Sequence, residues 1–407
     1  MSEERIKYKY PTIMNDETFP TGSDLLDLVV GGGQRYGYPA GRIVNIVGDK
    51  SSGKTFLACE LIAASYYKWR EKFRWVYDDA ESGFTFNTQD LYGFDVIPAD
   101  KRYKSRTVEE WACNVRLFLD SLKSDEIGIY VLDTLDGLSS QQIHARSEER
   151  FKNFKTKGDA TVKGSYQMEA AKFLSQEFFR ELTFLVEQKK VLLVIISQVR
   201  DKIDSLFNEQ TRSGGRALDF YAHTVLWLST MQKVVKKDRV VGVVVKALTK
   251  KSKTPRPFRS CILTLLFDYG VDNVGSNVDF LYDLRTEKGE LRSAGEMLRW
   301  SDGTKELTPK ALVEFIAEKG KGDLFKEHKK LYNLEGVKKI TEWIYGEGGL
   351  REAFEDAFGI AMKRNELIEW IEKNNKQAQL TAKVRAKWET LEESIRSIRP
   401  RKYENLT

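Results

Sequence analysis

The residues of this chain best suited to chemistry lie in one octapeptide, "GDKSSGKT". It matches the P-loop pattern G-x-x-x-x-G-K-[ST], in which glycines let backbone N–H groups wrap phosphates, the lysine reaches the β- and γ-phosphates, and the hydroxyl ligates Mg²⁺. The pattern therefore predicts a site for a nucleoside triphosphate and its Mg²⁺, with Lys54 as a catalytic group. The predicted site residues are Gly48, Asp49, Lys50, Ser51, Ser52, Gly53, Lys54 and Thr55.

Acidic residues elsewhere can complete this chemistry. Asp133 closes the apolar run "IGIYVLD", and an acid at the end of a buried strand can hold Mg²⁺ together with Thr55, although an aspartate there can also merely cap a helix. Hydrolysis further needs a group that orients a water, and "YDDAESG" offers Glu81 at the end of another strand. Asp78 and Asp79 compete for that role, and spacing alone leaves the choice open.

The elements that must position these residues run from about Ile43 to Leu266. Short apolar runs, nearly continuous as strands covered on both faces must be, alternate with helical segments. These runs are "RIVNIV", "FRWVY", "IGIYVLD" and "KVLLVIIS". Three β-rich runs follow without intervening helices, "TVLWLS", "RVVGVVVKAL" and "CILTLLFDYG". We predict an α/β core with a mostly parallel central sheet that hairpin strands extend.

Three parts are expected along the chain. Residues 1–24 form a short N-terminal segment, in which "RIKYKY" can supply an oligomerisation strand. Residues 25–272 form the nucleotide-binding core, and residues 275–407 form a small, mainly helical accessory domain. Within that domain a polar break at 374–377 separates a helix with Leu367 and Ile371 from a last helix. The last helix has an apolar face at three- and four-residue steps, made of Leu380, Val384, Trp388, Leu391 and Ile395.

Composition excludes several classes of protein. With 41% hydrophobic and 31% charged residues, the 407-residue chain is too apolar for general disorder, and it has no apolar run near the roughly 18 residues of a membrane span. Its start lacks an apolar signal core, so we expect a cytoplasmic protein. The cysteines and histidines are scattered, which supports neither a disulfide framework nor a metal site beyond the nucleotide's Mg²⁺. The net charge of +6 permits an anionic partner.

Taken in order, these segments resemble the RecA-type recombinases, including the phage UvsX-like branch. The resemblance covers residues 21 to about 270 and rests on an ordered series of segments. The series is "TGSDLLDLVVGGG", "PAGRIVNIVGDKSSGKT", "DAESG" with "GFDV", "IYVLDTLDGL", "VIISQVRDKI", "SGGRALDFYA" and "KKSKTPRPF". It implies a RecA-like P-loop NTPase core that uses ATP and Mg²⁺.

The resemblance also implies roles for particular residues. It implies that Glu81 activates the attacking water and that Gln198 senses the γ-phosphate at the base of a DNA-binding loop. Lys251 and Lys253 match the family's lysine pair, which implies that they approach the ATP of a neighbouring subunit and stabilise transition-state charge. The alternative for this pair is a solvated basic hairpin turn.

Two DNA-binding loops follow from the same resemblance. The loop after Gln198 has basic groups for phosphates, an aromatic ring for stacking on bases, and glycines for close backbone approach. Its residues are Arg200, Lys202, Phe207, Arg212, Gly214, Gly215 and Arg216. The other loop lies between Asp136 and a helix beginning near Met168, and its basic residues are interleaved with Phe151 and Phe154. The candidates there are Arg150, Lys152, Lys155, Lys157 and Lys163.

The chain departs from the family's pattern in two places. Thr88 stands where an aromatic residue often faces adenine, and only about twenty residues precede "TGSDLLDL", fewer than the bacterial oligomerisation helix and strand require. The expected function is a DNA-dependent ATPase that assembles on single-stranded DNA as an oligomer or filament and promotes pairing and strand exchange with homologous duplex DNA. The alternatives are a recombination mediator or regulator without strand exchange, and a RecA-core helicase.

Overall fold

A computed structural model provides the structure of the chain. Of residues 157, 200, 201, 210–212, 215 and 216 it describes the backbone alone. The described residues are 17–32, 36–98, 104–157, 173–174, 178–201, 210–212, 215–292, 295–301 and 307–396.

A central β-sheet organises the core in the order β11-β10-β9-β8-β3-β6-β5-β4. The pairs from β8 through β3, β6 and β5 to β4 are parallel, whereas β9, β10 and β11 add to β8 in antiparallel fashion. The mostly parallel sheet with hairpin extensions is therefore confirmed. The strands are β3 (Arg42–Gly48), β4 (Phe73–Asp79), β5 (Ile127–Asp133), β6 (Val191–Asp201), β8 (Thr224–Lys236), β9 (Arg239–Ser252), β10 (Ser260–Leu266) and β11 (Gly270–Val271).

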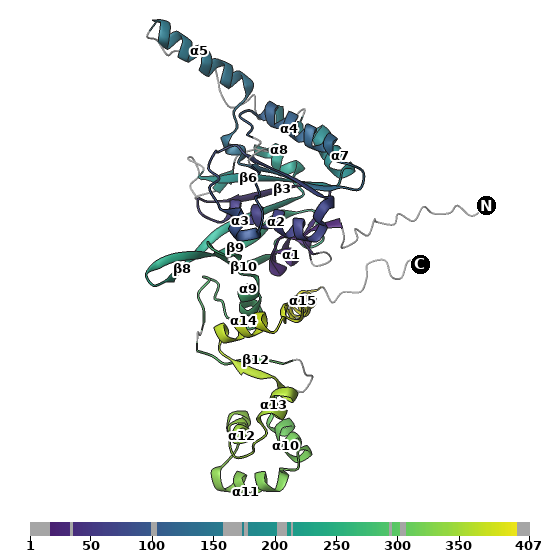
Figure 1. Cartoon of the computed structure of the whole chain (residues 1–407), viewed down its shortest axis with the longest axis vertical. Helices are drawn as coiled ribbons and strands as arrows, with labels where there is room; N and C mark the ends of the chain where they lie inside the picture. The colour runs from purple at the N-terminus through teal and green to yellow at the C-terminus, as the bar shows by residue number, and fades with distance from the viewer. Residues whose placement is uncertain are drawn as a thin grey trace, which may run out of the picture. The chain divides into compact units, whose positions relative to one another are not determined.

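Helices cover both faces of this sheet (Figure 1). One face carries α4 (Val108–Ser121), α7 (Phe179–Gln188) and α8 (Gly215–Tyr221), and the other carries α1 (Asp24–Gly31) and α2 (Lys54–Trp69). On the first face, buried helix side chains such as Trp111 and Phe179 pack with strand residues such as Tyr130 and Leu193 in one continuous cluster. Burial on both faces explains why the central strands are apolar along their whole length.

Local sequence explains where these helices begin and end. The side chains of Ser23 and Thr107 accept hydrogen bonds from the backbone N–H groups of Leu26 and Glu110, which caps α1 and α4. The residue before α2 is Gly53, with a φ of +87°. The positive φ favours glycine, and a Cβ atom there would also displace a methyl carbon of Leu265, which it would meet at 2.3 Å.

The chain forms two compact units, and their limits differ from the expected division at 275. The first unit is Met1–Glu290 with Gln379–Thr407, and the second is Leu291–Ala378. The first unit therefore includes α9 (Asn273–Leu281) and nearly all of α15 (Gln377–Ser394). The expected apolar face of α15 is only partly correct, because Leu380, Val384 and Trp388 are buried but Leu391 and Ile395 are exposed. Glu392 is the buried residue that continues the four-residue step.

The second unit is mainly helical. Its core consists of large apolar side chains from four helices, among them Phe315, Phe325, Trp343 and Phe354. A short antiparallel pair, β12 (Leu298–Trp300) with β13 (Ile360–Met362), leads into α14 (Arg364–Lys373). The four helices are α10 (Pro309–Glu318), α11 (Gly322–Tyr332), α12 (Gly336–Tyr345) and α13 (Arg351–Phe358).

Part of the expected first DNA-binding loop is a helix. Residues Gln141–Lys157 form α5, whose first backbone N–H group donates to the Glu109 carboxylate over 3.0 Å. The family resemblance implied a loop here, but most residues of this charged segment are compatible with a helix, and propensity accumulates over such a length. Among the described residues, no helix combines the length and the apolar character needed to cross a membrane.

Candidate nucleotide site and adjoining DNA-binding segments

The predicted phosphate-binding residues lie between the end of β3 and the start of α2. Lys54 is the first residue of α2, and its ammonium group donates to the backbone carbonyls of Gly48 (2.8 Å) and Asp49 (2.7 Å). Burial lowers the pKa of Lys54, and the carboxylates around it, led by Asp133, oppose that shift. The free N–H groups of the helix start and the positive end of its dipole favour an anion at this place.

Thr55 and Asp133 meet in the way that a magnesium site requires. The Thr55 hydroxyl donates to Oδ2 of Asp133 over 2.7 Å, and the Tyr77 hydroxyl donates to the same oxygen over 2.5 Å. Burial raises the pKa of Asp133, which a nearby divalent cation would reverse. These groups fit Mg²⁺, which is usually held by one or two protein oxygens together with phosphates and waters. Within the part of the chain that the structure describes, no cluster of three acidic, histidine or cysteine residues could hold a metal by itself.

The three carboxylates that compete for the water-orienting role have different surroundings. Asp78 is buried, and it accepts hydrogen bonds from the Ser105 backbone and hydroxyl and from Tyr130. Asp79 accepts from two backbone N–H groups of the turn that follows, at 3.2 and 3.3 Å. Only Glu81, of these three, joins residues from the neighbouring strand ends, so geometry favours Glu81.

Glu81 is connected to Gln198 directly. Its Oε1 accepts from the Gln198 side-chain amide over 2.7 Å and from the Thr134 hydroxyl over 2.7 Å. The Gln198 backbone N–H in turn donates to the Asp136 carboxylate over 2.8 Å. Gln198 pairs with Gly48 across β6 and β3, so the phosphate loop, Glu81 and Gln198 share the carboxyl edge of the sheet.

The two ends of the segment after Gln198 pair with each other as antiparallel strands. β6 continues to Asp201 and pairs antiparallel with β7 (Gln210–Arg212), with Val199 opposite Arg212. Arg200 therefore lies on one strand and Arg212 on the other, while Gly215 and Arg216 begin α8. Lys202, Phe207 and Gly214 lie outside the described residues, as does Lys163 of the first loop.

An apolar pocket beside the phosphate loop was not predicted. Residues of the loop, Glu81 and Asp133 share a cavity of about 360 Å³ with the rings of Phe84, Phe86 and Phe267. Thr88 is buried outside it, and its hydroxyl accepts from the Val96 backbone N–H over 3.0 Å. The signal that could have found the pocket is the pair of phenylalanines in "GFTF", directly after "DAES".

Lys251, the first of the paired lysines, lies near the end of β9, beside the start of β8. Lys251 pairs with Val225, which pairs with Asn45, three residues before Gly48 on β3. At about 3.3 Å per residue and about 4.8 Å per strand, the Lys251 backbone is on the order of 10 Å from the start of the phosphate loop along β3 and two strands to its side. The Lys251 ammonium group donates to the carbonyls of Asp219 and Phe220, the latter over 3.1 Å, at the end of α8.

The four remaining basic candidates, Arg150, Lys152, Lys155 and Lys157, all lie on α5. Phe151 and Phe154 on the same helix are exposed by 66% and 59%. Exposed rings and cations on one helix are compatible with a nucleic-acid surface, since aromatic rings stack on bases and cations neutralise phosphates.

Together, the parallel sheet, the phosphate loop and the acids at the strand ends define a P-loop nucleotide-binding protein. The chain belongs to the RecA N-terminal domain family, whose profile matches residues 7–96 and 154–272. It is 29% identical over 290 residues to a protein named RecA from Bacteroides thetaiotaomicron, covering 70% of this chain and 78% of that relative. A crystal structure of the RadB recombinase is similar, with a TM-score of 0.43 and 15% identity, over 62% of this chain and 98% of that one. Family membership assigns the chain a general role in homologous recombination as an ATP-hydrolysing protein.

Proposed function

We propose that this chain is a DNA-dependent ATPase that binds single-stranded DNA as an oligomer or filament and promotes homologous pairing and strand exchange. The observation that carries the proposal is the bond between Gln198 and Glu81 at the foot of the β6–β7 hairpin. One side chain thereby connects the site of hydrolysis to the segment that would hold DNA.

Each site residue has a role in this proposal. The phosphate loop and Lys54 bind and neutralise the triphosphate, and Thr55 and Asp133 hold Mg²⁺, which supplies charge neutralisation at the phosphates when it is bound. Glu81 accepts a proton from, or orients, the attacking water, and Thr134 fixes its carboxylate. The rings of Phe84 and Phe86 provide an apolar wall for the base.

Nucleotide state would reach DNA through Gln198. Its amide can donate either to Glu81 or to a γ-phosphate, so a triphosphate competes for the bond that the described structure contains. Because β6 runs from Gln198 into the hairpin within four residues, a change in Gln198 alters the base of the DNA segment. Hydrolysis removes the γ-phosphate and reverses that change, which is how ATP would act as a switch.

A neighbouring copy of the chain would complete the site. The backbone of Lys251 lies on the order of 10 Å along the strands from the phosphate loop of its own chain and two strands to its side. Its ammonium group is bonded to carbonyls at the end of α8. This placement favours a contribution of the lysine pair to the nucleotide of another protomer. This geometry supports assembly into an oligomer in which each nucleotide lies at a subunit boundary.

One experiment tests the proposal and separates it from its alternatives. ATP hydrolysis is measured with and without single-stranded DNA over a salt series, and the complexes are viewed by electron microscopy. We expect stimulation by DNA, a steep loss with salt of about 0.7 in log affinity per log salt for each phosphate contact, and long regular filaments. Hydrolysis at the same rate with and without DNA contradicts the proposal, and small discrete complexes favour a mediator or regulator.

A further inference from the structure

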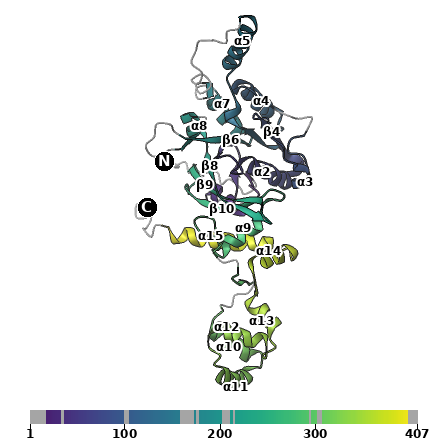
Figure 2. The ribbon, with the colours of Figure 1, turned by 90° about the vertical axis from the view of Figure 1, so that its left-hand side faces the viewer.

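Side chains of helix α15 bond to other helices of the first unit at several points. The Thr381 hydroxyl donates to the Asp24 carboxylate at the start of α1 over 2.8 Å. The Lys387 ammonium group donates to the carbonyls of Phe280 and Leu281 at the end of α9, each over 3.0 Å. A cation at a helix C-terminus stabilises the carbonyls that lack partners within the helix. Figure 2 shows α15 running beside α9 and close to β10.

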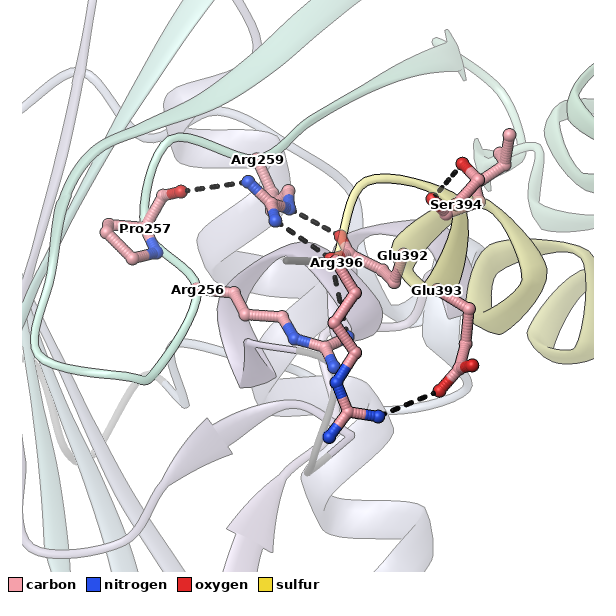
Figure 3. A network of polar contacts seen from close by, with 8 residues as sticks. Arg256, Pro257, Arg259, Glu392, Glu393, Ser394 and Arg396 are labelled. Carbon is pink, nitrogen blue, oxygen red and sulfur yellow. Dashed lines mark hydrogen bonds and ion pairs between the residues drawn. The ribbon is translucent and has the colours of Figure 1, made fainter. Parts of the chain in front are cut away.

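The last buried residue of α15 is a carboxylate. Glu392 has a side-chain exposure of only 5%, and it faces the turn between β9 and β10 (Figure 3). Arg259 donates to it through two nitrogens, with the Nη2–Oε2 distance at 2.8 Å, and Arg256 approaches Oε2 to 3.3 Å. The bonds from Arg259 lower the pKa of Glu392, so the carboxylate is ionised at neutral pH. A two-pronged arginine–carboxylate pair fixes orientation as well as distance.

The turn that Glu392 contacts begins with Lys253, and Lys251 lies two residues earlier, near the end of β9. Residues 253–259 connect β9 to β10, and the end of this turn is tied back to β9. The backbone N–H groups of Phe258 and Arg259 donate to the carbonyl and the hydroxyl of Thr249, each over 3.1 Å. The Lys253 backbone N–H donates to the His223 carbonyl over 2.9 Å. A displacement of Arg259 would therefore move the backbone around Lys251 and Lys253.

Charge gives Glu392 a specific role at this turn. The stretch from Lys250 to Arg259 contains several cations and no acid, so the cations repel one another when they are held close together. Glu392 adds a negative charge from a helix 133 residues away in sequence. Because Glu392 is buried, its removal would leave the partly exposed Arg256 and Arg259 without their carboxylate partner.

We propose that Glu392 is a positioning residue for ATP hydrolysis, which acts through Arg256 and Arg259 to hold Lys251 and Lys253 in place for the nucleotide of the neighbouring protomer. The inference rests on the proposed function, because it assigns α15 a part in the same subunit-boundary site. If Glu392 only stabilised the fold, its substitution would change the stability of the protein. If it positions the lysines, its substitution also lowers the rate of ATP hydrolysis in the assembled protein.

The first test compares Glu392→Gln with Glu393→Gln. Glu393 is the adjacent residue on the same helix, and its ion pair with Arg396 is exposed by about 70% on both sides, so it serves as the matched control. We expect kcat of the DNA-stimulated reaction to fall by about 3- to 30-fold in E392Q, the usual range for indirect coupling, with KM for ATP and DNA-free nucleotide affinity unchanged. E393Q should behave as the wild type. Arg259→Gln approaches the same contact from the partly exposed turn, and should give the same kcat defect if E392Q folds poorly.

The second test exploits the subunit boundary. E392Q protomers have an intact phosphate loop but a misplaced 253–259 turn. Lys54→Ala protomers have a defective phosphate loop but an intact turn. Mixed assemblies should therefore recover DNA-stimulated hydrolysis above the sum of the separate proteins. An unchanged kcat in E392Q and R259Q, or a reduced kcat that mixing does not restore, overturns the positioning role while the function stands. A wild-type protein that DNA does not stimulate overturns the proposed function and this inference together.

Discussion

Asp27 gives a prediction whose magnitude follows from burial. Its carboxylate lies inside the first unit, where Oδ1 accepts from the Thr21 backbone N–H over 2.8 Å. Desolvation by burial raises the pKa of Asp27 from 3.8 to about 7, against the lowering effect of the Thr21 hydrogen bonds. The folded state therefore binds a proton between these two pH values that the unfolded state has released. The stability that comes from the protonated form is complete below 3.8 and is lost as pH rises through about 7.

Asp27→Asn keeps an oxygen acceptor for Thr21 and removes the titration. Each pKa unit corresponds to about 1.4 kcal/mol, so the free energy of unfolding of the variant should gain on the wild type by up to about 4 kcal/mol between pH 4 and pH 8. Urea unfolding at several pH values measures this difference, and Glu393→Gln provides a control substitution of an exposed carboxylate. A stability difference between Asp27→Asn and the wild type that does not widen as pH rises would contradict a raised pKa of the buried Asp27.

Further predictions concern the nucleotide and DNA. Lys54→Ala should abolish nucleotide-dependent DNA binding, measured by fluorescence anisotropy; full retention of that binding would exclude the phosphate loop from the mechanism. Phe86→Ala should weaken nucleotide binding about 5- to 150-fold if the ring stacks on the base, while Phe184→Ala, an exposed ring on α7, should not. Phe207→Ala should weaken DNA affinity by about 1 to 3 kcal/mol and leave DNA-free nucleotide affinity unchanged, and equal affinities for DNA would contradict its stacking role.

Local pattern was sufficient for the core of the fold. The strand, phosphate loop and helix around Lys54 could be predicted because the P-loop spacing, the preceding apolar run and the following helical segment are contiguous in sequence. The choice among Asp78, Asp79 and Glu81 could not be made from spacing. It depends on Ser105 and Gln198, which reach these carboxylates only through the folded sheet.

Contacts between residues that are distant in sequence could not be predicted in the same way. The periodicity of α15 identified Leu380, Val384 and Trp388 correctly as buried, but it favoured Leu391 over Glu392 because an apolar residue is the usual occupant of a buried face. A buried carboxylate needs cationic partners, and Arg259 is 133 residues earlier in the chain. The contacts of α15 with the first unit are also between residues distant in sequence, and the sequence-based prediction therefore put α15 in a separate helical domain.

The long sequence interval between Arg259 and Glu392 has a consequence during synthesis on the ribosome. Translation at about 5 to 20 residues per second means that the arginine emerges on the order of 10 s before its carboxylate partner. During that interval the second unit, Leu291–Ala378, is made in full. A nascent chain would thus hold a folded sheet with an unsecured basic turn, and the final helix would complete the first unit only after the second has left the ribosome.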